Sequence, residues 1–362
     1  MCIRDRGIVA GPVADRFGAR RVVGVGAIFM GGGLWLTAQV QSLTAGVVVY
    51  GLGVGLGIGS YLVPLNAATG AWFERHRTIA LGVNTVGIGL GTLVLVPVAE
   101  WLIRTAGWRS AFELMGIGSF FVYGLVALAS FKPPTPQASV ATSIEAVKRA
   151  VQRSEFWRFY IAGFFMAIAL FVPFVFLVQY AKDQGISSST AAFLITSLGV
   201  GSVIGRLGLG ILGVRIGVLP LIVFCFAIQP VSYIVWLIAG SNYLLLLLFA
   251  ALLGVGYGGF VALSPVAMVG IFGLEGMGGV LGVQFTSAGF GALIGPISAG
   301  AIIDATGSYA IAIIGAIAIS SVATIAIYPL LRITNRDAKA APEVKTFLSA
   351  VSYTHLTLPT KA

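Results

Sequence analysis

The sequence predicts an all-α protein that crosses a membrane many times. Of its 362 residues, 58% are hydrophobic and only 9% are charged, and the mean hydropathy is +0.99. Soluble domains carry about 25% charged residues, so this chain has too few charges to cover a surface that faces water. The apolar segments do not alternate as the strands of a membrane β-barrel do, and the spans are therefore expected to be helices.

Ten apolar segments are long enough to span a bilayer, which takes about 20 helical residues. They lie at 22–39, 43–68, 78–101, 110–131, 157–181, 190–213, 217–239, 242–266, 278–303 and 308–331. A shorter apolar stretch at 7–14 is interpreted as the end of a helix whose beginning is missing. The compositions of 1–6 and 351–362 shift abruptly, and both are interpreted as non-native ends. The chain is therefore expected to be a fragment.

Positive charge alternates between successive loops. One set of loops holds Arg16, Arg20, Arg21, Arg75, Arg77, Lys132, Lys148, Arg149, Arg153, Arg215, Arg332, Arg336 and Lys339, whereas the other set holds Arg104, Arg109 and Lys182. Loops rich in Lys and Arg stay in the cytoplasm, so the first set and the C-terminal tail at 332–350 are predicted to be cytoplasmic. The net charge of +10 thus indicates membrane topology and does not point to nucleic acid.

The longest internal connection separates the chain into two halves. It begins with a stiff Pro-rich segment at 133–136 and continues with apolar residues on one helical face. Thr142 and Glu145 have the spacing of a capping box. The linker at 132–156 is predicted to contain a short amphipathic helix on the cytoplasmic membrane surface; a solvated linker is the alternative.

Short motifs recur about 200 residues apart. LGVN at 81–84 recurs as LGVQ at 281–284, each followed by two glycines and a proline. Gly11, Arg16 and Gly18 recur as Gly210, Arg215 and Gly217. Parallel repeats of this size build one large class of transporters, in which the substrate site lies at the midplane between the halves.

Arg206 is the one Lys or Arg that these assignments place deep within a span. Nine residues separate it from Arg215, which is roughly 13 Å along a helix axis. A charge at this depth usually faces a bundle interior or a wet cavity and indicates a functional site. The alternative is a structural arginine held by backbone carbonyls.

The loop GPVADRFGARR at 11–21 resembles the signature loop between the second and third helices of the major facilitator superfamily, with Ala19 at a position where the family has a basic residue. The resemblance implies a major facilitator fold of two pseudo-symmetric helical bundles. The chain would hold ten complete transmembrane helices and a stub of helix two, with helix one missing. The N-terminal bundle would occupy 7–131 and the C-terminal bundle 157–331.

Later motifs resemble the monocarboxylate porter and oxalate/formate antiporter branch of that family. They are WFERHR at 72–77, ALG at 80–82, GWR at 107–109, VP at 172–173, LVQYA at 177–181, GIS at 185–187 and GP at 295–296. The resemblance extends from residue 11 to about residue 331.

This resemblance implies that Arg206 grips a substrate carboxylate, for which a guanidinium is well shaped. Ser202 stands where animal-type members have an aspartate, so a proton switch there is not expected, and Ser202 is a candidate substrate-binding residue. The span 278–303 has no lysine for a second carboxylate, which favours a substrate with one anionic group. Tyr61 and Tyr257 resemble residues that line the cavity, although buried tyrosines commonly only pack.

The signature loop is expected to brace the gate on the cytoplasmic side. Its residues are Gly11, Asp15, Arg16, Gly18, Arg20 and Arg21, and we place Arg75, Arg77 and Arg215 in the same group. Val214 occupies the position of the aspartate in the second copy of the motif, so that copy is degenerate.

The predicted function is secondary active transport of a small organic anion, foremost a monocarboxylate, by alternating access. Proton symport is the commonest arrangement that the resemblance implies, yet no Asp or Glu lies mid-span. The alternatives are an anion exchanger, an efflux carrier of other small molecules, and a non-transporting membrane sensor on the same fold. No catalytic or metal-binding pattern appears, so neither an enzyme nor a cofactor is expected. We expect a monomeric, multi-pass protein in contact with lipid in a prokaryotic cell membrane.

Overall fold

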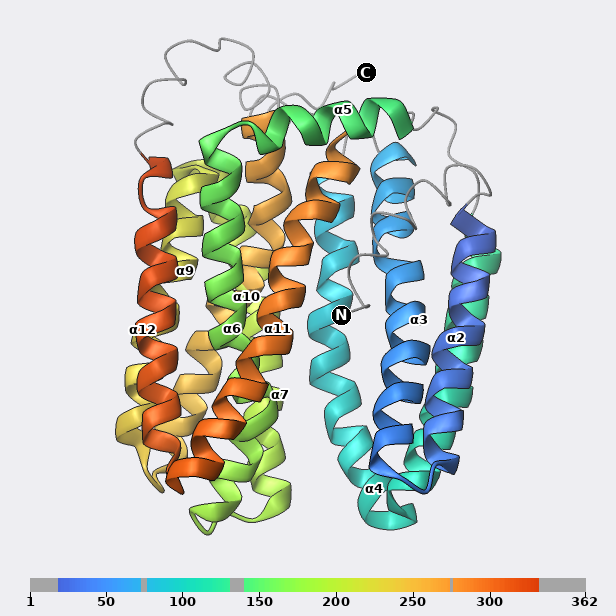
Figure 1. The fold of residues 1–362 in the computed structure, drawn as a ribbon, viewed down its shortest axis with the longest axis vertical. Helices are drawn as coiled ribbons and strands as arrows, with labels where there is room; N and C mark the ends of the chain where they lie inside the picture. The colour runs from blue at the N-terminus through green and yellow to red at the C-terminus, as the bar shows by residue number, and fades with distance from the viewer. Residues whose placement is uncertain (1–18, 73–76, 131–139, 274–275, 332–362) are drawn as a thin grey trace, which may run out of the picture.

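The computed structural model describes residues 19–72, 77–130, 140–273 and 276–331, which fold into helices joined by short connections (Figure 1). The helices are α2 (Ala19–Gln39), α3 (Leu43–Trp72), α4 (Arg77–Ala129), α5 (Val140–Val151), α6 (Ser154–Asp183), α7 (Ser188–Ile204), the π-helical turn η1 (Gly205–Leu209), α8 (Gly210–Ile216), α9 (Val218–Ala239), α10 (Tyr243–Phe272), α11 (Met277–Thr306) and α12 (Tyr309–Ile327). The predicted all-helical class is confirmed. The tail at 332–350 and the ends at 1–6 and 351–362 lie outside the described residues.

Within the described residues, nine helices are long and apolar enough to cross a membrane. The difference from the ten predicted spans lies in α4, which contains both 78–101 and most of 110–131. Gly107 interrupts α4 with φ 82° and ψ 162°, a backbone conformation that glycine adopts readily. The chain thus passes from one helical segment to the next without a separate loop. The predicted span 190–213 is shared by α7, η1 and α8.

Two groups of helices lie side by side in Figure 1, with α2, α3 and α4 in one and α6 to α12 in the other. Helix α4 also packs against α7, so the two groups are in contact. Buried aromatic rings stabilise the second group: Trp236 stacks on Phe249 with ring centroids 4.8 Å apart, and the Tyr233 hydroxyl donates a hydrogen bond to the carbonyl oxygen of Ala169 at 2.6 Å. These contacts join α6, α9 and α10 into one packed unit.

Helix α5 lies across one end of the other helices (Figure 1) and falls within the predicted linker at 132–156. Its residues Ala146 and Ala150 are buried in an apolar cluster that includes Met277, whereas Lys148 and Arg149 are exposed. The helix therefore has one apolar and one polar face. The capping-box assignment is wrong, because α5 begins at Val140 and Thr142 already lies inside its first turn.

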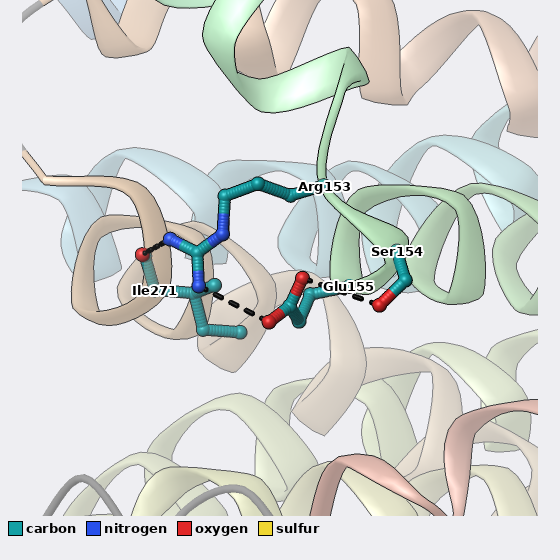
Figure 2. Close-up of polar contacts among 4 residues, drawn as sticks. All are labelled: Arg153, Ser154, Glu155 and Ile271. Carbon is teal, nitrogen blue, oxygen red and sulfur yellow. Dashed lines mark hydrogen bonds and ion pairs between the residues drawn. The ribbon is translucent and has the colours of Figure 1, made fainter.

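Arg153 fastens the junction of α5 and α6 to the end of α10, as Figure 2 shows. Its Nη1 donates a hydrogen bond to the carbonyl oxygen of Ile271 at 2.8 Å, and its Nη2 lies 3.1 Å from Oε1 of Glu155. The guanidinium also lies 5.2 Å from the centroid of the Phe272 ring. A cation near the carboxyl end of a helix is favourable, so Arg153 suits this position.

Candidate functional site

The segment that carries Arg206 departs from regular α-helix. Helix α7 begins after Ser187, whose hydroxyl accepts a hydrogen bond from the N–H of Thr190 at 3.3 Å. The apolar span continues from Ser188 to Gly213, but the turn η1 within it is π-helical and contains Arg206. Such turns accommodate one extra residue and recur at functional sites. The irregular turn and the intramembrane charge thus coincide.

Arg206 is buried, with 3% of its surface exposed. Its Nη1 donates a hydrogen bond to the hydroxyl of Ser202, one turn earlier. Its Nε and Nη2 atoms are buried and have no hydrogen-bond partner among the described residues. Within the same residues, no carboxylate forms an ion pair with it. One edge of the guanidinium is therefore left with two unused donors.

Glycine packing sets the position of Arg206 relative to α10. The glycines that face one another are Gly201 and Gly205 on one side and Gly254 and Gly258 on the other. A Cβ added to Gly205 would lie 2.2 Å from the carbonyl oxygen of Val255, and one on Gly258 would lie 2.0 Å from that of Ser202. Each pair has the four-residue spacing of small-residue contacts between membrane helices. The two backbones therefore touch beside the arginine.

This close contact brings Tyr257 of α10 to Arg206. The Cζ atom of Arg206 lies 5.4 Å from the centroid of the Tyr257 ring, which is within the range of a cation–π interaction. The Tyr257 ring in turn meets Phe174 of α6 edge to face, with centroids 6.1 Å apart. Arg206, Ser202 and Tyr257, three of the four residues predicted to bind substrate, thus form one cluster; their role in binding stays a prediction.

Tyr61 lies elsewhere. It packs on Tyr123 of α4, with ring centroids 5.1 Å apart, and no contact between Tyr61 and Arg206 is found in the described residues. Tyr61 and Tyr123 belong to the first helix group, whereas the arginine cluster belongs to the second. Tyr61 therefore lies in a different helix group from the other three predicted substrate-binding residues.

The predicted gate residues are only partly described. Gly11, Asp15, Arg16, Gly18 and Arg75 lie outside the described residues, as does the side chain of Arg77, which begins α4. Arg20 and Arg21 are exposed on the first turn of α2 and line a groove of about 700 Å³ between α2 and α4. Arg215 is exposed on α8 and lines an apolar pocket of about 420 Å³ with Val255.

Two features of the site were missed from the sequence. The π-helical turn has no sequence signal that we recognised. The glycine contact did have one, because GSVIG at 201–205 and GVGYG at 254–258 both place glycines four residues apart. Within the part of the chain that the structure describes, no group of three or more His, Cys, Asp or Glu is arranged to hold a metal ion.

Comparison with known proteins identifies the class. The family model of the Major Facilitator Superfamily matches residues 7–187 and again residues 159–358. Together these matches include most of the chain. The protein therefore belongs to the major facilitator superfamily, a family of membrane transporters, as the signature loop had indicated.

Several characterised relatives are monocarboxylate transporters. Monocarboxylate transporter 4 of Gallus gallus is 31% identical over 313 residues, which cover 82% of this chain and 65% of the relative. Monocarboxylate transporter 12 of Homo sapiens is 29% identical over 332 residues, covering 79% of this chain and 62% of the relative. The aspyridones efflux protein apdF of Emericella nidulans is 26% identical over 315 residues, which cover 84% of this chain and 61% of the relative. The chain thus spans less than two thirds of the length of these relatives.

Two crystal structures of the E. coli fucose:proton symporter FucP have the same fold. One has a TM-score of 0.66 at 17% identity and covers 90% of this chain and 87% of the symporter. The other, in the outward conformation, has a TM-score of 0.62 at 16% identity and covers 90% of this chain and 86% of FucP. The family and the apolar helices establish a multi-pass membrane protein. The relatives named here come from animals and a fungus, so the prokaryotic source stays a prediction.

Proposed function

We propose that the protein transports a small organic anion with a single carboxylate and that Arg206 binds this carboxylate. The observation that carries the proposal is the buried Nε–Nη2 edge of Arg206, which has no partner among the described residues. The two oxygens of a carboxylate match such an edge and accept both hydrogen bonds at once. Ser202 already occupies Nη1, so the substrate would approach from the opposite side of the guanidinium.

The energetics favour an anionic ligand. A buried polar group without a partner costs about 1–3 kcal/mol, and a charged group costs more. A bound carboxylate would satisfy both donors and neutralise the charge of Arg206. The ring of Tyr257 would support the guanidinium from its face. The similarity to proteins named monocarboxylate transporters supports the same substrate class.

Transport would proceed by alternating access of the bundles at 7–131 and 157–331. The linker at 132–156 would connect them, and the signature-loop arginines, together with Arg75, Arg77 and Arg215, would brace the gate. In this proposal Tyr61 lines the pathway from the first bundle, which agrees with its position on a different helix group from Arg206. The protein would act as a monomer with its C-terminus in the cytoplasm.

The test is uptake of labelled lactate, pyruvate, formate and oxalate by the purified full-length parent protein in proteoliposomes. The three monocarboxylates are compared with the dicarboxylate oxalate. We expect Arg206→Ala to abolish uptake, whereas Arg149→Ala, which removes an exposed arginine from α5, retains it. Unchanged uptake by Arg206→Ala would refute the role of the arginine. Absence of uptake by the unaltered protein would instead favour an efflux carrier of other compounds or a non-transporting sensor.

Anion exchange is a second candidate, favoured by the lack of a carboxylate partner for Arg206 in the described residues. With the anion bound, the site is neutral; when the site is empty, it holds a buried positive charge. Reorientation of the empty carrier is then disfavoured, and exchange of one anion for another avoids it. Exchange predicts that unlabelled anion inside the vesicle accelerates labelled uptake. Proton symport predicts that an inward proton gradient does so with empty vesicles.

A further inference from the structure

The groove between α2 and α4 is separate from the Arg206 cluster and has a composition of its own. It has a volume of about 700 Å³ and is lined by Arg20, Arg21 and Gly24 of α2 and by Phe121, Gly124 and Leu125 of α4, among others. Its volume falls in the range of about 300–1,000 Å³ typical of small-ligand sites. Two cations stand at one end of an otherwise apolar groove.

Glycines leave part of the groove without side chains. Near the middle of α2, a Cβ on Gly31 would lie 2.6 Å from the Cβ of Phe120, so the helices touch there. At Gly24 the nearest atom to an added Cβ is that of Ala127 at 3.9 Å, and at Gly124 nothing lies within 4 Å. An added Cβ therefore has more room at Gly24 and Gly124 than at Gly31. The groove has no side chain at these two positions.

The wall of the groove faces outward. Phe121, Leu125 and Leu128 are 62%, 65% and 58% exposed, and their spacing places them on one face of α4. In a multi-pass membrane protein, such a face contacts acyl chains. Arg20 and Arg21 lie at the first turn of the membrane-spanning helix, where basic side chains reach lipid headgroups. None of the described acidic residues forms an ion pair with either arginine.

We propose that this groove binds one anionic phospholipid. The guanidinium groups of Arg20 and Arg21 hold the phosphate, and one acyl chain lies over Gly24 and Gly124 against Phe121 and Leu125. The charge of the two arginines selects an anionic headgroup. Gly24 and Gly124 have no side chains, which leaves room for the acyl chain. This site is independent of the proposed carboxylate site, because none of its residues contacts Arg206 within the described structure.

Native mass spectrometry of the purified protein in detergent tests the proposal, with phosphatidylglycerol, phosphatidylcholine and glycerol 3-phosphate as probes. We expect one phosphatidylglycerol to bind at least about tenfold more tightly than phosphatidylcholine. The double variant Arg20→Gln/Arg21→Gln should bind phosphatidylglycerol about 30-fold more weakly, because each basic residue near a membrane surface adds to the attraction for anionic lipid. Excess glycerol 3-phosphate should not displace the lipid.

A second pair of variants tests the acyl-chain part without changing charge. Gly124→Leu places a side chain in the empty groove and should weaken phosphatidylglycerol binding at least about tenfold. Gly118→Leu is the matched control, because Gly118 is equally open, lies on the same helix and does not line the groove. It should bind lipid as the unaltered protein does.

Three results would overturn the proposal. They are equal binding of the two lipids, full displacement by glycerol 3-phosphate, which would indicate a site for free phosphate, and unchanged binding by Gly124→Leu. Helical content and thermal unfolding, measured for every variant, separate loss of lipid from loss of fold. The measurements of lipid binding, helical content and thermal unfolding do not depend on transport.

Discussion

The hydroxyl of Ser202 accepts a hydrogen bond from Nη1 of Arg206, one turn further along the same membrane span. This bond lies within one membrane span, and the ring of Tyr257 on α10 contacts the same guanidinium. The bond leaves the Nε–Nη2 edge unpaired. In the proposed function, this edge receives an acceptor with two oxygens.

Ser202→Asp should make transport strongly dependent on pH. An ionised carboxylate at this position would pair with Arg206 and compete with the substrate, and its protonation at lower pH would release the guanidinium. Uptake by the variant should therefore rise as pH falls. Ser202→Ala is the control and should lack this added dependence. Parallel pH profiles of initial uptake rate for the two variants would contradict the idea.

Arg206→Lys should retain the charge but lose most of the transport. An ammonium cannot donate two parallel hydrogen bonds to a carboxylate as a guanidinium does. We expect kcat/KM for uptake to fall about tenfold or more, the equivalent of roughly 1.4 kcal/mol. If Arg206→Lys had the same kcat/KM for uptake as the unaltered protein, a positive charge at this position would be sufficient for transport.

Tyr257→Phe should be tolerated, whereas Tyr257→Leu should not. The ring of Tyr257 contacts both Arg206 and Phe174, and phenylalanine keeps this ring. Loss of a desolvated cation–π interaction costs about 1–2 kcal/mol, which corresponds to a five- to thirtyfold weaker affinity. The measurement is the apparent affinity for the transported anion. A phenylalanine variant as defective as the leucine variant would instead implicate the hydroxyl.

Gly205→Ala should destabilise the fold, and Gly208→Ala should not. An added Cβ at Gly205 would collide with the backbone of Val255, whereas at Gly208 nothing lies within 4 Å. Forcing extra atoms into a packed contact costs about 1–3 kcal/mol. The melting temperature in detergent should fall for the first variant and stay within error for the second. Both glycines belong to η1, so the comparison isolates the contact with α10.

Arg153→Gln should loosen α5 from the end of α10. It removes the hydrogen bond to Ile271 and the ion pair with Glu155, although the side chain of Arg153 is 43% exposed. The effect on global stability should stay below about 1 kcal/mol, as is usual for exposed pairs. Hydrogen exchange of amides in α5 should nevertheless increase. Arg149→Gln is the control, and an equal increase there would point to loss of general surface charge.

The helical class and most spans could be predicted because membrane helices require long apolar runs, which the sequence displays directly. The break at Gly107 was predicted as well, because the predicted spans end at 101 and resume at 110 with Arg104 and Arg109 between them; that the break would be a single residue without a separate loop was not. The helix limits also differ from the predicted spans: α10 continues to Phe272 in place of 266. The apolar run bounds the bilayer, whereas the helix continues as far as its backbone hydrogen bonds extend.

The candidate site also has features that the sequence could predict and features that it could not. Arg206 was recognisable because a lone charge in an apolar span is costly. Its partnership with Tyr257 depends on a helix contact between residues about 50 positions apart, and only the glycine spacing could have indicated it. Tyr61 was grouped with these residues by a resemblance to cavity-lining positions, and its role stays a prediction. In the structure it packs on Tyr123 of the first helix group.

The turn η1 has one further consequence. Each residue of an α-helix advances the chain by about 100° around the helix axis. A π-helical turn contains one more residue than a regular α-helical turn. If η1 became regular α-helix, α8 would rotate relative to α7 by about that angle. The orientation of Arg215 around the axis, relative to Ser202 in the same span, therefore depends on whether the extra residue stays in this turn.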